Sequence, residues 1–218
     1  MSRDIVYATR DAHGLIEVRE SYSGAIRTLH FGNDIEQSRY DLNAPFTLGF
    51  EYLQVGFDRL MAIQPTTLLS LGLGGGRLNT QLLYALPHCR QTVVELRPAV
   101  IHIAREWFHL PEAANLAVVQ GDAFEYISTC RKHFDAIFID LYDGQGMPPI
   151  FATPAFFEEV LRCTTTILIN IWQSDNAFKA LLRSWLVQQP HLTLKRHRIQ
   201  SSPNWLMEIT VNGATNPA

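Results

Sequence analysis

Two aspartates three residues apart, Asp140 and Asp143, follow an apolar run and could serve acid–base chemistry. The run at 134–139 predicts a buried strand, so the Asp140 carboxylate would lie at its end. Close carboxylates raise each other's proton affinity and attract cations. One could therefore hold an ammonium group while the other takes a proton from an attacking amine. The alternative is that both residues only shape a turn. No His or Cys spacing supports a metal site here.

A cluster of four glycines, Gly72, Gly74, Gly75 and Gly76, follows another apolar run. Glycine permits a sharp turn and leaves no Cβ between the backbone and a ligand. The helix expected next would direct the positive end of its dipole toward an anion or an electron-rich group. The competing interpretation is a tight strand-to-helix turn without a ligand.

Two further carboxylates end the neighbouring runs. Glu95, followed by Leu96, lies 23 residues beyond Gly72, about where a ribose-binding acid belongs. Asp122, followed by Ala123, could cap a helix, accept a hydrogen bond from an adenine amino group, or do both. The alternative to ribose binding by Glu95 is a surface ion pair with Arg97. The four acids predict a nucleoside-binding crevice at the carboxyl ends of parallel strands.

The elements that must position these residues alternate from residue 66 onward, which is typical of a doubly wound α/β sheet. We expect seven strands, the last two forming an antiparallel hairpin. The strands are expected at 67–72, 91–96, 116–120, 134–139, 165–171, 192–199 and 205–212. Helices are expected at 76–86, 98–108, 122–131, 153–162 and 174–187.

The first 45 residues have a different pattern, with short strand-like runs separated by HG, SG and GN turn signals. Residues 1–45 are therefore expected to form a small β meander, with runs at 5–8, 15–21, 25–31 and 34–38. A helix is expected at 46–63, opening a main domain at 46–212. The tail at 213–218 is expected to be disordered.

The composition excludes several classes of protein. The chain has 218 residues and a net charge of −3, so it offers no broad basic surface for nucleic acid or lipid. Its apolar runs are much shorter than the ~20 residues that span a membrane. Without an export signal at its start, the chain is expected in the cytoplasm. Cys89, Cys130 and Cys163 are expected to be buried free thiols.

From about residue 14 to 172 the sequence resembles the spermidine synthase (polyamine aminopropyltransferase) family, in particular bacterial spermidine-synthase-like proteins. The resemblance is carried by the β meander closing on Gln37, the helix bearing Tyr52, and the motifs GLGGG at 72–76, VEL around Glu95, GDAFEYI at 121–127 and DLYDGQGMP at 140–148. It implies a Rossmann-like α/β fold with the seven-stranded sheet of S-adenosylmethionine methyltransferases and a small N-terminal antiparallel β unit.

The resemblance also implies roles for residues. Asp140 would be the catalytic base or ammonium anchor, and Asp143, Tyr52 and Tyr142 would bind the amine. The nucleoside donor would be bound by Gln37, Gly72, Gly74, Gly75, Gly76, Glu95, Leu96, Asp122 and Ala123. Core packing is the alternative for Tyr52. The donor would be decarboxylated S-adenosylmethionine, a co-substrate and not a tightly bound cofactor, and the protein would be a homodimer.

One departure from the family pattern bears on the donor. Gly75 occupies the position of the family aspartate that holds the ammonium group of the donor. The first hypothesis, motivated by the four acids, is aminopropyl transfer to a small amine such as putrescine. The alternatives are an S-adenosylmethionine-dependent methyltransferase and a catalytically silent nucleoside-binding homologue.

Overall fold

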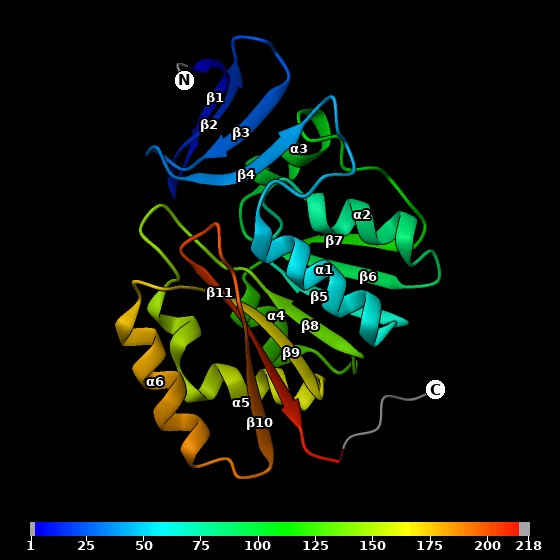
Figure 1. Cartoon of the computed structure of the whole chain (residues 1–218), viewed down its shortest axis with the longest axis vertical. Helices are drawn as coiled ribbons and strands as arrows, with labels where there is room; N and C mark the ends of the chain where they lie inside the picture. Colours follow the sequence, from blue (N-terminus) through cyan, green and yellow to red (C-terminus); the bar gives the residue numbers. More distant parts are fainter. Residues whose placement is uncertain (1–2, 214–218) are drawn as a thin grey trace.

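The computed structural model describes residues 3–213, which form two β-sheets and six α-helices (Figure 1). The N-terminal sheet is antiparallel, with the strand order β1-β2-β3-β4. Its strands are β1 (Arg3–Asp11), β2 (Gly14–Ser21), β3 (Ile26–His30) and β4 (Glu36–Asp41). The tail expected to be disordered is 213–218, and its residues 214–218 lie outside the described residues.

The main sheet has seven strands in the order β10-β11-β9-β8-β5-β6-β7. The strands are β5 (Thr67–Leu71), β6 (Arg90–Glu95), β7 (Leu116–Gln120), β8 (Ala136–Ile139), β9 (Thr166–Trp172), β10 (Leu192–His197) and β11 (Asn204–Val211). β5 to β9 are parallel, and β11 pairs antiparallel with both β9 and β10. The chain therefore has the expected α/β fold, with the strand order reversing between β5 and β8.

Helices cover both faces of this sheet (Figure 1). They are α1 (Glu51–Ile63), α2 (Arg77–Ala85), α3 (Pro98–Glu106), α4 (Ala123–Thr129), α5 (Pro154–Cys163) and α6 (Asn176–Val187), with a short 3-10 helix, η1 (Pro149–Ala152). Apolar residues alternate between the faces, as the two-residue repeat of a strand requires. Leu69 and Leu71 pack with α4, α5 and α6, whereas Leu68 packs with α1 and α2. Both cores are apolar, which fixes the register of the central strands.

The start of α1 differs from the expectation. The helix was expected from residue 46 but begins at Glu51, after Phe50 in an extended conformation. The segment before it runs against the N-terminal sheet, where a Cβ on Gly49 would lie 2.6 Å from the Arg39 Cβ. The Gln81 side-chain amide donates to the Phe46 backbone oxygen at 2.5 Å. These contacts hold residues 46–50 as a connection and not as a helical turn.

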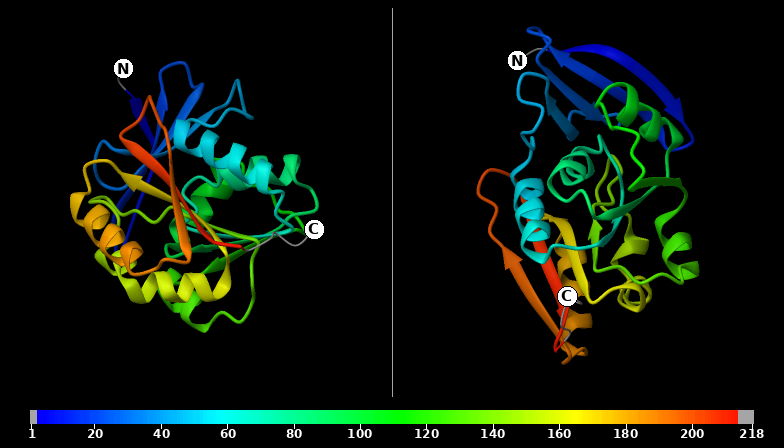
Figure 2. Two further views of the ribbon diagram at one scale, coloured as in Figure 1. Left: turned by 60° about the horizontal axis from the view of Figure 1, so that its bottom comes forward. Right: turned by 90° about the vertical axis from the view of Figure 1, so that its right-hand side faces the viewer.

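The N-terminal sheet lies at one end of the molecule, and its apolar side packs on α3 (Figure 2). Ile16, Val18 and Leu29 meet Val100 and Ile103 in a separate small core. Because the sheet lacks a helix of its own, this contact is what buries its apolar face.

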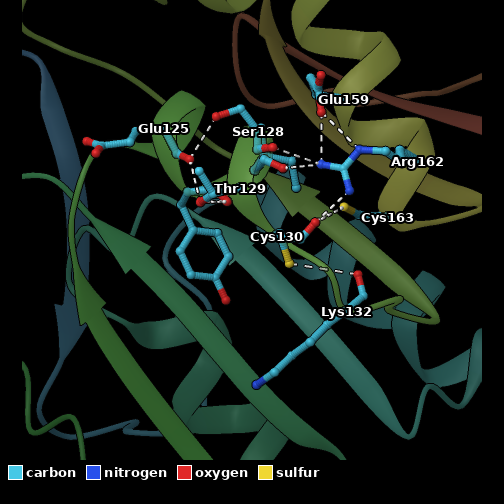
Figure 3. A network of polar contacts seen from close by, with 10 residues as sticks. Glu125, Ser128, Thr129, Cys130, Lys132, Glu159, Arg162 and Cys163 are labelled. Atoms are coloured by element: carbon cyan, nitrogen blue, oxygen red, sulfur yellow. Dashed lines mark hydrogen bonds and ion pairs between the residues drawn. The ribbon is translucent and has the colours of Figure 1, made fainter.

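Arg162 of α5 binds the last turn of α4 (Figure 3). Its guanidinium donates to the backbone oxygens of Ile127 and Cys130, at 2.7 and 2.5 Å. The Ile127 oxygen also accepts from the Cys130 amide at 3.3 Å, so Arg162 adds to the C-terminal cap of the helix. Cys130 and Cys163 lie beside it, and all three cysteines of the chain are buried free thiols, as expected. Between residues 3 and 213 no helix is long and apolar enough to cross a membrane.

Candidate active site

A cavity of about 500 Å³ opens at the carboxyl ends of the parallel strands. It lies where the strand order reverses, which is the usual place for a ligand in an open α/β sheet. The main sheet contributes the ends of β5, β6, β8 and β9. The start of β4 and the residue before it contribute residues 35–38, and the end of the β10–β11 connection with the first residue of β11 contributes residues 202–204.

Gly72 allows the ends of β5 and β8 to approach each other. Its φ of +93° is one that other residues rarely adopt, and an added Cβ would lie 2.2 Å from the Asp140 backbone oxygen. The Asp140 amide in turn donates to the Leu71 oxygen at 2.9 Å. The glycine motif and the Asp140 loop are thus parts of one local structure.

Asp140 lines this cavity, and both of its carboxylate oxygens accept hydrogen bonds. Tyr52 of α1 donates its hydroxyl to Oδ2 at 2.9 Å, and Asn170 of β9 donates its amide to Oδ1 at 2.8 Å. Burial raises the pKa of Asp140 above its ordinary value, whereas these two hydrogen bonds oppose that rise. Burial and the nearby Asp140 raise the pKa of Tyr52 well above its ordinary value, so its hydroxyl stays protonated.

Aromatic rings form the wall beside Asp140. Tyr142 stacks on Trp172 with the ring centroids 5.1 Å apart, and Phe50 stacks on Tyr52 at 5.8 Å. The Tyr142 hydroxyl donates to the Asn170 backbone oxygen at 2.9 Å. Aromatic faces next to a carboxylate suit a cation with an apolar chain.

Glu95 ends β6 on the other side of the glycine motif and is 9% exposed. Its Oε2 accepts from the Leu73 amide at 3.1 Å and its Oε1 from the Arg97 amide at 2.9 Å. Burial raises the pKa of Glu95, and the backbone hydrogen bonds oppose the rise. The suspected ion pair with Arg97 does not form, because that guanidinium binds Asp11 instead. Each Glu95 oxygen retains a lone pair that can accept from a hydroxyl.

Asp122 caps α4, since its Oδ1 accepts from the Glu125 amide at 2.9 Å. It also lines the cavity with Ala123. The position of Asp122 is therefore compatible both with capping the helix and with accepting a hydrogen bond from an adenine amino group.

Two neighbouring side chains from β4 line the cavity near the glycines. The Gln37 Nε2 is buried and has no hydrogen-bonding partner among the described residues, so it could donate to a ligand. Ser38 fills space beside Gly75: a Cβ there would lie 2.5 Å from the Ser38 Oγ and 2.6 Å from the Phe108 ring. The position that carries an acid in the family is thus closed by a hydroxyl and a buried ring.

The structure brings twelve of the thirteen predicted site residues to this one cavity. They are Gln37, Tyr52, Gly72, Gly74, Gly75, Glu95, Leu96, Asp122, Ala123, Asp140, Tyr142 and Asp143. Gly76 is the exception: it caps α2 in a left-handed conformation, with its amide bound to the Leu73 oxygen at 2.9 Å, and does not line the cavity. Lining the cavity does not test the binding roles, which stay predictions.

Asp143 is exposed, and its Oδ1 accepts from the amides of Gln145 and Gly146 at 2.6 and 3.0 Å. This is the turn-forming role considered as its alternative. Its binding role depends on Oδ2, which neither of these hydrogen bonds uses.

The sequence interpretation missed the connection between β10 and β11. Asn204 donates its amide to the Asn170 Oδ1 at 2.8 Å, and Ser202 and Pro203 line the cavity beside it. A turn was visible in QSSPN, but its place over the cavity depends on the pairing of β11 with β9, where Asn204 lies opposite Trp172.

The cavity is acidic in character. Glu36, Glu95, Asp122, Asp140 and Asp143 line it, together with two arginines and His13. Both guanidinium groups are engaged elsewhere, because Arg97 binds Asp11 and Arg77 binds the backbone oxygens of Phe108 and Pro45. This arrangement favours a cationic ligand. No group of three or more potential metal ligands occurs within residues 3–213.

The fold and cavity define a Rossmann-like α/β protein of the methyltransferase type with an additional N-terminal sheet. The chain is 31% identical over 179 residues to a polyamine aminopropyltransferase of Neisseria meningitidis, covering 79% of this chain and 68% of the relative. It belongs to the polyamine aminopropyltransferase family, and it is therefore a transferase. No protein-family model matches the sequence.

Among the solved structures that share the fold are a spermidine synthase and a methyltransferase-like protein. A probable spermidine synthase from Corynebacterium glutamicum has a TM-score of 0.77 at 20% identity, covering 97% of this chain and 81% of that one. Human methyltransferase-like protein 13, solved in complex with SAH, has a TM-score of 0.61 at 24% identity, and the match covers 77% of this chain and 81% of that one. The longer match of the synthase includes the N-terminal sheet.

Proposed function

We propose that this protein transfers an aminopropyl group from decarboxylated S-adenosylmethionine to a small amine such as putrescine. The observation that carries the proposal is the position of Asp140, bound by Tyr52 and Asn170, in the same cavity as Glu95 and the glycine motif. Family membership supports the same reaction.

The nucleoside would lie along the ends of β5, β6 and β7. Glu95 would accept hydrogen bonds from the ribose hydroxyls, and Asp122 would accept from the adenine amino group through the oxygen that does not cap α4. The sulfonium and the acceptor ammonium are both cations, which the acidic lining favours.

In the reaction, the amine nitrogen would attack the terminal carbon of the aminopropyl chain that is bonded to sulfur. A nitrogen–carbon bond forms, the carbon–sulfur bond breaks, and its electron pair returns to sulfur, giving methylthioadenosine. The nitrogen loses one proton, which the Asp140 carboxylate would take. The protein supplies proximity and a base, and no covalent intermediate is needed.

The test is to supply purified protein with decarboxylated S-adenosylmethionine and putrescine and to measure methylthioadenosine. We expect turnover, and a loss of about 10²- to 10⁴-fold in kcat for Asp140→Asn, because the amide cannot take a proton. Asp135→Asn is a matched control, since Asp135 binds Thr66 and Thr67 at the other end of β8. Failure with every amine tried would contradict the proposal.

Methyl transfer from S-adenosylmethionine is the second candidate. The specific observation in its favour is Gly75, where Ser38 and Phe108 replace the acid that would bind the donor's ammonium group. Formation of adenosylhomocysteine instead of methylthioadenosine would identify this reaction. A silent nucleoside-binding protein would give neither product but would gain thermal stability with methylthioadenosine.

We further propose that the protein is a homodimer in the cytoplasm, following the sequence-based expectation. Sedimentation equilibrium would measure its mass directly, and a single 24.7 kDa species at all concentrations would contradict the dimer. Cell fractionation would test the location.

A further inference from the structure

Three polar side chains from three elements form a chain of hydrogen bonds that ends on Asp140. Asn204 of β11 donates its amide to the Asn170 Oδ1 at 2.8 Å. Asn170 of β9 then donates its own amide to the Asp140 Oδ1 at 2.8 Å. Asn170 and Asn204 are buried, at 2% and 8% exposure, so water is largely excluded from the chain.

We propose that Asn170 and Asn204 are positioning residues, which keep the Asp140 carboxylate charged and oriented by fixing the direction of one amide group. This inference rests on the proposed function, in which Asp140 is the base.

The direction of the Asn170 amide is the central point. A side-chain amide presents an oxygen on one side and an NH₂ group on the other. Because Asn204 donates to the oxygen, the NH₂ group of Asn170 must point toward Asp140. The reversed amide would place two NH₂ groups together and aim an oxygen at the carboxylate, leaving buried polar groups without partners.

The surroundings of Asp140 give this hydrogen bond unusual weight. The titratable groups that face it are Tyr52 of α1 and Tyr142 after β8. β5 presents the backbone of Gly72 and β9 presents the neutral Asn170. No lysine, arginine or histidine of residues 3–213 is among the groups that shift the Asp140 pKa. Only the hydrogen bonds from Asn170 and Tyr52 counter the cost of burying the charge.

The experiment measures the pKa of Asp140 directly, by ¹³C NMR of its carboxyl carbon, with the signal identified by its absence in Asp140→Asn. Asn170→Leu removes the donor and should raise the pKa by about one unit, the usual worth of a hydrogen bond to a charged group. Asn204→Asp, which when ionised can only accept, should turn the Asn170 amide and raise the pKa in the same direction.

Activity provides the second readout. In both variants the acidic limb of the kcat/KM profile should move to higher pH, and activity should recover as pH rises and Asp140 ionises. A general loss of structure would not give that recovery. The KM for the donor should change little, because the donor is expected near Glu95.

Gln173→Ala is the matched control. Gln173 donates to the backbone oxygens of Ser202 and Asn204, at 3.3 and 3.2 Å. It therefore holds the same loop but makes no hydrogen bond with the side-chain amides of Asn170 and Asn204. Its replacement should leave the Asp140 pKa unchanged. An unshifted pKa in folded Asn170→Leu and Asn204→Asp would overturn the inference. If instead the wild-type protein forms no product from any donor and amine, the proposed function fails. The NMR titration would still decide whether Asn170 and Asn204 control the ionisation of Asp140.

Discussion

Gly75 shows how a single residue can alter the part of the cavity that is proposed to meet the donor's tail. An aspartate there would need the space that Ser38 and the fully buried Phe108 now occupy. The substitution is therefore more than a missing carboxylate, because the neighbouring side chains have closed over the position. Restoring the acid alone would not restore a binding site for an ammonium group.

The packing at Gly75 can be tested with alanine. Gly75→Ala should lower the free energy of unfolding by about 1–3 kcal/mol, the usual cost of overpacking a core. Gly121→Ala is the control, because a Cβ at Gly121 would have no neighbour within 4 Å. Urea denaturation of both variants measures the difference, and equal stability of the two would show that the cavity wall yields easily at Gly75.

At the scale of elements, the connection between β10 and β11 is held against α1 by one carboxylate. Oε2 of Glu51 accepts from the Gln200 amide at 2.9 Å and from the Ser201 amide and hydroxyl at 2.6 Å each. These hydrogen bonds lower the pKa of Glu51. The next two residues along the chain, Ser202 and Pro203, line the cavity. Glu51 therefore helps to position one wall of the cavity, which under the proposed function would face the amine acceptor.

Removal of this anchor should affect the acceptor more than the donor. For Glu51→Ala we expect the KM for the amine to rise several-fold while the KM for the donor stays within about twofold, because ordering the freed loop again costs conformational entropy. Asp58→Ala is the control, since Asp58 lies exposed on the same helix and binds Gln54. Steady-state kinetics with each substrate varied would measure both constants. An equal rise in both KM values would indicate a wider loss of structure.

The sequence predicts those elements whose determinants are local. The parallel strands end in glycine or an acid within their own segments, so β5, β6 and β8 and the residues at their ends could be placed from the sequence. The start of α1 could not, because contacts with the N-terminal sheet keep residues 46–50 out of the helix. Asn204 was also out of reach, since its contact with Asn170 depends on a pairing between strands 34 residues apart.

At the scale of the whole molecule, the two sheets are joined by an ion pair as well as by their apolar core. Arg97 binds both oxygens of Asp11, at 2.8 and 2.9 Å, and the Gly14 backbone oxygen at 2.9 Å. The same arginine follows Glu95 by two residues and gives it its backbone amide. Attachment of the N-terminal sheet is therefore coupled to the geometry of the cavity at Glu95, where the nucleoside is proposed to bind.

This ion pair should make stability depend on pH in a defined way. The Arg97 hydrogen bonds hold the pKa of Asp11 below its ordinary value. Because the pKa of Asp11 is lower in the folded protein than in the unfolded chain, where it is about 3.9, its ionisation stabilises the fold at pH values above 3.9. This stabilisation is lost as the pH falls through the pKa of Asp11 in the folded protein. Asp11→Asn should therefore lower the free energy of unfolding at pH 7 by about 1–3 kcal/mol, as expected for hydrogen bonds to a charged group.

The decisive comparison is between two aspartates of the N-terminal region. Asp34 also pairs with an arginine, Arg19, but its side chain is 96% exposed, so water screens the pair and Asp34→Asn should change stability little. Denaturation at pH 7 and at pH 3 would measure both variants against the wild type. The deficit of Asp11→Asn should shrink at pH 3, where Asp11 begins to protonate in the wild type. A deficit that stays constant with pH would mean that packing, and not the charge on Asp11, attaches the N-terminal sheet.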